Sequence, residues 1–134
     1  MSGTEEFLTD VLCLLDCGAY LNLIRPEAVM KLGLPIQRLY KPICVTLALN
    51  GMDTAVWLTN YVRISLSSKN NAWSSKTVPL LIADGLCNEI LLGLPFLTHN
   101  DIVIDAKART VIDKKSGLIW LMKTRLHLSL NLLN

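Results

Sequence analysis

The sequence predicts an all-β domain with one or two short helices and a small, closed or strongly curled sheet. Hydrophobic residues make up 51% of the 134 residues, whereas aromatic residues make up only 6%. The Leu, Ile and Val residues fall mostly into short alternating runs, which favour strands over long helices. A chain of this length suits a single domain with a buried core. We therefore expect one domain over residues 1–134, with its core at about 7–122 and a tail or terminal strand at 123–134.

The N-terminal part predicts a buried strand, a sharp turn and a short helix. The run Phe7–Leu15 is strongly apolar and ends at Asp16, and Tyr20–Ile24 is a second extended piece. Pro26 suits the first position of a helix, and Gly33 suits its C-terminal cap. A helix of about two turns is therefore expected between Pro26 and Gly33.

The middle of the chain predicts a long β-hairpin. Apolar and small or polar residues alternate over Ile43–Leu49, and Asn50-Gly51 follows them. Both turn residues tolerate positive φ, so this pair predicts a two-residue type I′ turn. The returning strand continues to Leu66, and the Ser-, Lys- and Asn-rich stretch Ser67–Lys76 predicts an exposed loop.

The second half predicts further short strands and one short helical segment. We expect strands at Val78–Ala83, Glu89–Leu92, Ile102–Ile104, Thr110–Ile112 and Leu118–Met122, and one or two helical turns at Leu94–His99. Leucines alternate with other residues from Leu126 to Leu132. A period of two over this length indicates either a half-buried terminal strand or a frayed extension, and the sequence leaves both open.

Charge and composition argue against several function classes. The net charge is +2 and the basic residues are scattered, so nucleic-acid binding is not expected. No apolar stretch approaches the roughly 18 residues that span a bilayer, so no membrane partner is expected. The first residues are acidic where a secretory signal is basic, which indicates an intracellular, cytoplasmic protein.

The cysteines predict neither a metal site nor another cofactor. They lie at positions 13, 17, 44 and 87 without a CxxC pair, and the chain has only two histidines, His99 and His127. A zinc site needs about four well-placed ligands. Buried, reduced thiols are therefore expected.

Asp16 is the first candidate for chemistry. It directly follows a buried strand, and Gly18 lets the chain turn sharply after it. A carboxylate in such a place is costly unless its oxygens accept hydrogen bonds. Taken alone, Asp16 fits an aspartate that caps a turn somewhat better than it fits a catalytic group.

Three motifs occur in a characteristic order. Leu14-Leu15-Asp16-Cys17-Gly18-Ala19 comes first, Ala48-Leu49-Asn50-Gly51-Met52 forms the hairpin tip, and Leu91-Leu92-Gly93 precedes Leu94-Pro95-Phe96-Leu97. This set resembles the retropepsin-like aspartic proteases of retroviruses and long-terminal-repeat retrotransposons. The resemblance extends from about Phe7 to Leu121.

The resemblance implies an acid-protease-like β-barrel with one lobe per chain, and a homodimer as the active form. Asp16 is then the single catalytic residue of each chain, on an active-site loop with Cys17, Gly18 and Ala19. The flap that covers the substrate corresponds to Ala48, Leu49, Asn50, Gly51 and Met52, and the loop is supported by Leu91, Leu92 and Gly93. Aspartic proteases are the established example of two carboxylates that share a proton and titrate as a pair, and the resemblance implies the same for the two copies of Asp16.

The resemblance further implies an extended peptide or polyprotein substrate, bound by strand-like main-chain hydrogen bonds. It predicts an endopeptidase that processes a retrotransposon polyprotein. Two features depart from the family: Cys17 replaces the usual Thr or Ser, whose hydroxyl bridges the dimer axis, and only the mostly polar segment Met1–Glu6 precedes the first strand. A catalytically degenerate dimerisation or peptide-binding module, or a monomeric all-β interaction domain, are the alternatives.

Overall fold

The computed structural model describes residues 10–49, 51–68, 73–121 and 126–131. Strands dominate these ranges, so the predicted all-β class is confirmed. The elements are β1 (Asp10–Leu15), β2 (Leu23–Ile24), α1 (Pro26–Leu32), β3 (Gln37–Leu49), β4 (Met52–Ser67), β5 (Val78–Ile82), β6 (Ile90–Leu92), α2 (Leu94–His99), β7 (Ile102–Asp105), β8 (Thr110–Asp113), β9 (Ile119–Leu121) and β10 (Leu126–Asn131). Among the helices described, none has the length and apolar character needed to cross a membrane.

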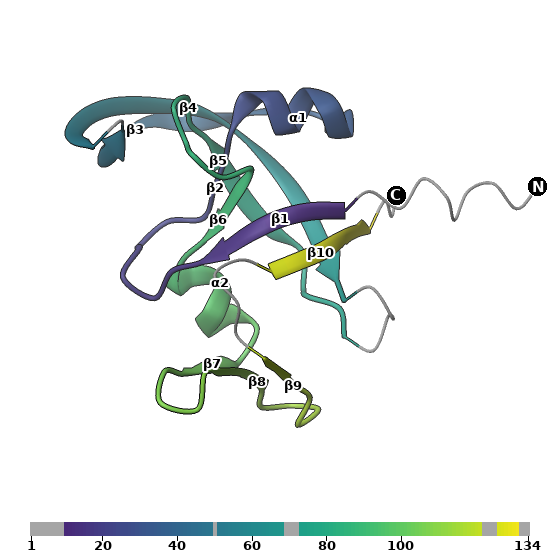
Figure 1. Ribbon diagram of the computed structural model, residues 1–134. Helices are drawn as coiled ribbons and strands as arrows, with labels where there is room; N and C mark the ends of the chain where they lie inside the picture. Colours follow the sequence, from purple (N-terminus) through teal and green to yellow (C-terminus); the bar gives the residue numbers. More distant parts are fainter. Residues whose placement is uncertain (1–9, 50, 69–72, 122–125, 132–134) are drawn as a thin grey trace, which may run out of the picture.

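Two sheets make up the fold, a larger mixed one and a smaller antiparallel one (Figure 1). The larger sheet has the strand order β10-β1-β6-β2-β5-β4-β3, and the smaller one has the order β7-β8-β9. Strand β10 pairs with β1 through Leu126–Ser129 and also with β4 through Ser129–Asn131. The strand pairing therefore returns from β4 to β1, with β3 added outside β4. Of the two interpretations of the tail, the strand holds for 126–131, and Leu132 lies outside the described residues.

At the centre of the larger sheet, the ends of β1 and β6 lie side by side. Strand β6 lies between β1 and β2; it runs parallel to β1 and antiparallel to β2. Its register pairs Leu15 with Leu92, so both parallel strands end side by side. Because the carboxyl ends of parallel strands meet at one edge, Asp16 and Gly93 follow next to each other.

The predicted hairpin is present as β3 and β4. Leu49 pairs with Met52, which leaves a two-residue turn, and Gly51 has a φ of 78°. That positive φ is the reason that glycine suits this position. Asn50, the other turn residue, lies outside the described residues.

Both helices form where the sequence predicts them. Helix α1 begins at Pro26, and Gly33 ends it in the left-handed conformation with φ 64°. Helix α2 spans Leu94–His99 with a proline in its first turn. The first N–H groups of a helix have no partner within the helix. A proline in the first turn therefore costs neither helix a hydrogen bond.

The segment before β5 corrects a sequence prediction about burial. The stretch Ser67–Lys76 is expected from its composition to be exposed, but Ser67, Ser68, Ser75 and Trp73 are buried. The Trp73 ring packs edge-on against Phe96 at 6.2 Å between ring centroids, so this segment closes one side of the core. Its residues 69–72 lie outside the described ranges.

The cysteines correct a second prediction, because only Cys13 of the four is buried. Cys17, Cys44 and Cys87 are exposed, and all four are free thiols. Burial, together with the neighbouring Glu89 carboxylate, raises the pKa of Cys13 far above its usual range. Cys13 is therefore a small apolar core residue of β1, because an unreactive neutral thiol packs like a hydrophobe.

Glu89 connects β1, α1 and the start of β6. Its Oε1 accepts the Leu12 N–H at 3.2 Å, and its Oε2 lies 2.9 Å from Lys31 Nζ. Burial alone would raise the pKa of Glu89, but the hydrogen bonds from Lys31 and Leu12 and the charges of Lys31 and Arg25 outweigh burial and hold the pKa below its ordinary 4.5. The ionised form is therefore favoured by folding.

Glu89→Gln is expected to lower the free energy of unfolding at pH 7 by roughly 1 kcal/mol, a small value because Lys31 is half-exposed. The folded-state pKa is depressed, so this stabilisation is complete above pH 4.5 and is lost as pH falls through the lower folded-state value. Urea unfolding of both chains at several pH values measures it. Asp53→Asn, at an exposed position of β4, is the control. A wild-type advantage that persists unchanged in strong acid contradicts the assignment.

Candidate active site

Asp16 lies at the carboxyl end of β1 and is half-buried. Its backbone N–H donates to the Leu92 carbonyl at 2.9 Å, which extends the pairing of β1 with β6 by one residue. Its Oδ1 accepts the Gly18 N–H at 2.9 Å, and its carbonyl accepts the Ala19 N–H at 3.1 Å. A side chain that accepts the N–H two residues on closes an Asx turn and fixes its own direction. Asp16 therefore does cap a turn, and that turn holds the carboxylate in one orientation.

Asp16 lines a cavity of about 520 Å³. The cavity walls come from the loop after β1, from β2, from β3, from β6 and from the segment before β6. They are formed by Asp16, Gly18, Ala19, Tyr20, Leu21, Leu23, Val45, Thr46, Leu47, Leu86 and Leu91. Most of these side chains are apolar, and Asp16 is the one carboxylate among them. A cavity with apolar walls and one fixed polar group suits an extended peptide that places apolar side chains in it.

Among the described residues of the hairpin, those of its middle contribute to this cavity. Val45, Thr46 and Leu47 of β3 line it, and Val45 and Leu47 also pack against the buried Leu23 and Leu58. Met52 is 70% exposed, and Gly51 is exposed as well. The sequence assigns this role to residues 48–52; Asn50 and the side chains of Ala48 and Leu49 lie outside the described part of the chain.

Of the three residues predicted to support the loop, Leu92 and Gly93 contact it and Leu91 lines the same cavity. The Leu92 carbonyl accepts the Asp16 N–H, and Leu91 lines the cavity. Gly93 lies directly against the loop, where a Cβ would come within 2.6 Å of the Ala19 carbonyl oxygen and 2.5 Å of the Leu21 carbonyl oxygen. The next residue, Leu94, donates its N–H to the Ala19 carbonyl at 2.8 Å. The start of α2 is thus joined to the loop through backbone atoms.

Asn22 is a supporting residue that the sequence does not predict. It is only 7% exposed, and its Oδ1 accepts the Gly93 N–H at 3.0 Å and the Phe96 N–H at 3.3 Å. It therefore caps the N-terminus of α2, whose first N–H groups have no partner within the helix. A polar residue inside the apolar segment Leu21–Ile24 is the signal that could have indicated it, because buried polar groups require partners.

Cys17 does not line the cavity, and its side chain is exposed. Tyr20 and Leu86 line the cavity without any sequence signal that predicts them. Among the residues described, His, Cys, Asp and Glu form no group of three or more suited to a metal ion. The candidate chemistry therefore depends on the Asp16 carboxylate.

A single carboxylate limits what one chain can do. Hydrolysis of an amide by acid–base catalysis needs one group that takes a proton from water and another that gives a proton to the carbonyl oxygen. Asp16 can perform one of these tasks at a time. A second carboxylate must therefore come from outside this chain's cavity.

Comparison with known proteins identifies a family. The sequence model of a family described as aspartyl protease matches residues 8–96, a range that includes Asp16, both strands of the hairpin and Gly93. Among solved structures, the chain is similar to the retroviral protease-like domain of Ddi1 from Leishmania major, with 13% identity and a TM-score of 0.47 over 87% of this chain and 94% of that chain. None of the curated proteins matches the chain.

Proposed function

Because the chain belongs to the aspartyl protease family, we propose that it is an aspartic endopeptidase whose active form is a homodimer. One observation carries this proposal: a single carboxylate, that of Asp16, is held by its own turn in a peptide-sized, apolar cavity. Two copies of the chain supply the two carboxyl groups that acid–base hydrolysis requires. Symmetric dimers are the commonest way to bring two copies of one residue together.

The proposed reaction uses one ionised and one protonated Asp16. The ionised carboxylate takes a proton from water while the water oxygen bonds to the scissile carbonyl carbon, and the protonated carboxyl gives its proton to the carbonyl oxygen. This step forms a tetrahedral diol and exchanges the protonation states of the two carboxyl groups. The newly ionised carboxylate then takes a proton from one diol hydroxyl, and the newly protonated carboxyl gives its proton to the amide nitrogen. The C–N bond breaks, and the pair again holds one proton.

The cavity walls suit an extended substrate. Val45–Leu47 belongs to β3, which among the described strands pairs only with β4, and its other edge is proposed to form main-chain hydrogen bonds with the substrate. The apolar side chains around Asp16 then receive alternate substrate side chains, because neighbouring residues of a strand point to opposite faces. Ala48–Met52 is proposed as the hairpin tip that closes over the substrate, together with residues 45–47.

We place the enzyme in polyprotein processing of the retrotransposon type, in the cytoplasm. The motif order around Asp16, the hairpin and Gly93 supports this role. Free, exposed thiols at Cys17, Cys44 and Cys87 support a reducing compartment, since such thiols pair or oxidise in the secretory pathway.

The experiment that tests the proposal is cleavage of a peptide library by the purified chain, with the mass of the protein in solution measured under the same conditions. Cleavage that rises with the dimer fraction as protein concentration increases is expected. Robust cleavage at concentrations where only monomer is present contradicts the dimer, and a dimer that binds peptides without cleaving them favours the peptide-binding alternative.

The presence of a cysteine at position 17 favours the peptide-binding alternative, because a thiol next to Asp16 is a weaker hydrogen-bond donor than a hydroxyl. Cys17→Thr is expected to tighten the dimer by up to about tenfold, since one neutral hydrogen bond contributes roughly 0.5–1.5 kcal/mol. Sedimentation equilibrium measures the dissociation constant, and initial rates of cleavage measure activity.

Cys44→Thr is the matched control, because it makes the same exchange at an exposed site of β3. It is expected to leave both quantities within about twofold of wild type. A catalytically degenerate module would show tighter dimers in Cys17→Thr but still no cleavage.

A further inference from the structure

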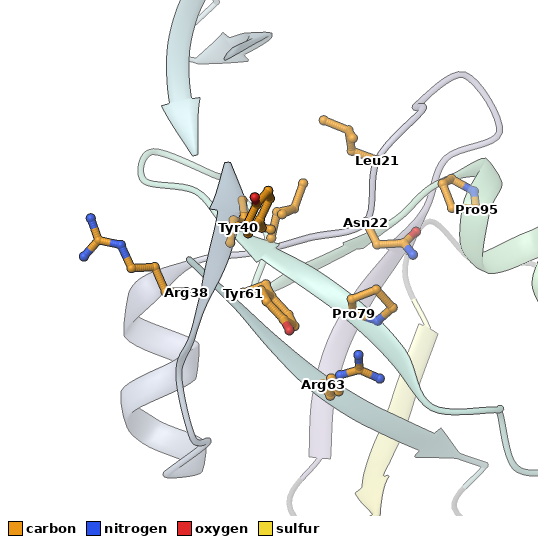
Figure 2. Close-up of a pocket in the computed structure, with 10 residues that line it drawn as sticks. Leu21, Asn22, Arg38, Tyr40, Tyr61, Arg63, Pro79 and Pro95 are labelled. Atoms are coloured by element: carbon orange, nitrogen blue, oxygen red, sulfur yellow. The ribbon is translucent and has the colours of Figure 1, made fainter. Parts of the chain in front are cut away.

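A second cavity, of about 610 Å³, lies outside the Asp16 site (Figure 2). It is bounded by the beginning of β3, by β4 and β5, and by the start of α2. Of the residues that line it, only Leu21 also lines the Asp16 cavity. The residues that give it chemical character are Arg38, Tyr40, Tyr61, Arg63, Pro79 and Pro95.

An irregularity in β3 forms one wall of this cavity. Arg38 pairs with Asn60, and the next pair is Ile43 with Leu58, so residues 39–42 stand opposite Thr59 alone. The extra residues leave the ladder and carry Leu39 and Tyr40 to the rim. Tyr40 is 95% exposed as a result. Bulges of this kind re-aim side chains and are frequent beside functional sites.

The rim of the cavity is positively charged. Arg38 and Arg63 are both exposed, and in the view of Figure 2 the rings of Tyr40 and Tyr61 lie between them. Neither arginine has an ion pair among the described residues, and no Asp or Glu lines the cavity. The Arg63 guanidinium lies 5.9 Å from the centre of the Tyr61 ring, which holds its charge at the rim.

The interior of the cavity is apolar. Proline, leucine and the Tyr61 ring supply most of the lining away from the rim, and Asn22 is the buried polar residue among the lining residues. Asn22 Oδ1 is already occupied by two backbone N–H groups of α2, which leaves its Nδ2 as the atom that could donate to a ligand. The cavity therefore favours an apolar group inside and anionic groups outside.

We propose that this cavity binds an acidic peptide segment of a partner protein. A bulky apolar side chain of the segment packs against the tyrosines and prolines, and flanking carboxylates pair with Arg38 and Arg63. Tyr and Arg are the residues that contribute most to protein–protein affinity, and opposite charges across the contact select the partner. The two cations, without a longer basic stripe, fit a short acidic peptide better than a nucleic acid.

Fluorescence anisotropy of a labelled peptide, Gly-Asp-Glu-Leu-Phe-Asp-Glu-Gly, tests the proposal with the full chain. The expected result is saturable binding that weakens with added salt. The Arg38→Gln/Arg63→Gln chain is expected to bind at least about tenfold more weakly, because two charge-assisted hydrogen bonds are lost. The same peptide with Asn and Gln in place of Asp and Glu is expected to bind equally weakly to both chains.

The matched control is Lys107→Gln/Lys114→Gln, which removes the same charge at exposed sites near the small sheet and leaves binding within about twofold. Equal loss in both double variants, or equal binding of the uncharged peptide, overturns the proposal. A change of oligomeric state in the Arg38→Gln/Arg63→Gln chain also overturns the proposal, because it would show that a second copy of the chain occupies the cavity. Binding that requires removal of residues 1–9 assigns the cavity to the chain's own acidic N-terminal segment instead.

Binding here is separable from catalysis. The Asp16→Asn chain is expected to bind the acidic peptide with unchanged affinity, because Asp16 does not line this cavity. Failure of peptide cleavage therefore leaves this proposal standing, and failure of peptide binding leaves the enzymatic one standing. A peptide that binds the wild-type chain but not Asp16→Asn occupies the Asp16 cavity and overturns the inference.

Discussion

Asp16→Asn is expected to lower peptide cleavage at least about a thousandfold, to the limit of detection. An amide cannot take a proton from water and cannot give one to the carbonyl oxygen, so both proposed roles of Asp16 are lost in every dimer. The rate of cleavage of a fluorogenic peptide, at saturating and at limiting concentrations, measures the loss.

The substitution is chosen because it leaves the fold unchanged. Asn Oδ1 can accept the Gly18 N–H as Asp16 Oδ1 does, so the turn after β1 is retained. The free energy of unfolding is expected to stay within about 1 kcal/mol of wild type, and the solution mass to be the same. Cleavage that survives in a folded Asp16→Asn chain removes Asp16 from the mechanism.

Mixing the two chains separates a shared site from an independent one. If each site needs two copies of Asp16, an equal mixture with Asp16→Asn that re-pairs at random retains about a quarter of the activity per total chain. If each chain instead carries an independent site, about half remains. The mixture is denatured and refolded together so that the subunits exchange, and activity is measured against the fraction of wild-type chain.

The sequence predicts best the elements whose determinants are local. Pro26 and Gly33 mark the ends of α1, and Gly51 with its φ of 78° marks the hairpin turn, because each is a requirement of backbone geometry at that position. The sequence leaves the tail open because a short strand is stabilised by its partners, and β10 finds them in β1 and β4, far away in the chain. Burial of Trp73 depends on Phe96 in the same way.

The residues of the candidate site differ in the same way: those in local motifs can be predicted from the sequence, and those that depend on distant contacts cannot. Asp16 and Gly93 can be identified because each belongs to a motif of a few consecutive residues. The middle of the hairpin cannot, because the alternation of Val45 and Leu47 indicates a strand without saying which face meets Asp16. Asn22 is missed because its hydrogen bond to Gly93 joins residues 71 positions apart.

Gly93→Ala is expected to destabilise the fold more than alanine at Gly18, Gly33, Gly51 or Gly117. Its φ is −98°, so the backbone conformation itself suits any residue. The cost is steric: the new Cβ would lie 2.5 Å from the Leu21 carbonyl oxygen and 2.6 Å from that of Ala19, and neither atom belongs to a flexible side chain. Overpacking against fixed atoms costs about 1–3 kcal/mol. Any backbone shift that relieves the clash would also weaken the hydrogen bond from the residue 93 N–H to Asn22 Oδ1 and add to the cost.

Gly117→Ala separates this steric cost from the ordinary cost of replacing glycine. Gly117 has a φ of 77°, but a Cβ there would meet nothing within 4 Å, so only the left-handed conformation opposes alanine. That conformation costs roughly 1–2 kcal/mol. Urea unfolding is expected to rank Gly93→Ala below Gly117→Ala in stability, and any folded Gly93→Ala chain is expected to lose cleavage because the Asp16 loop must move. If the two variants are equally stable and equally active, the start of α2 does not position the carboxylate.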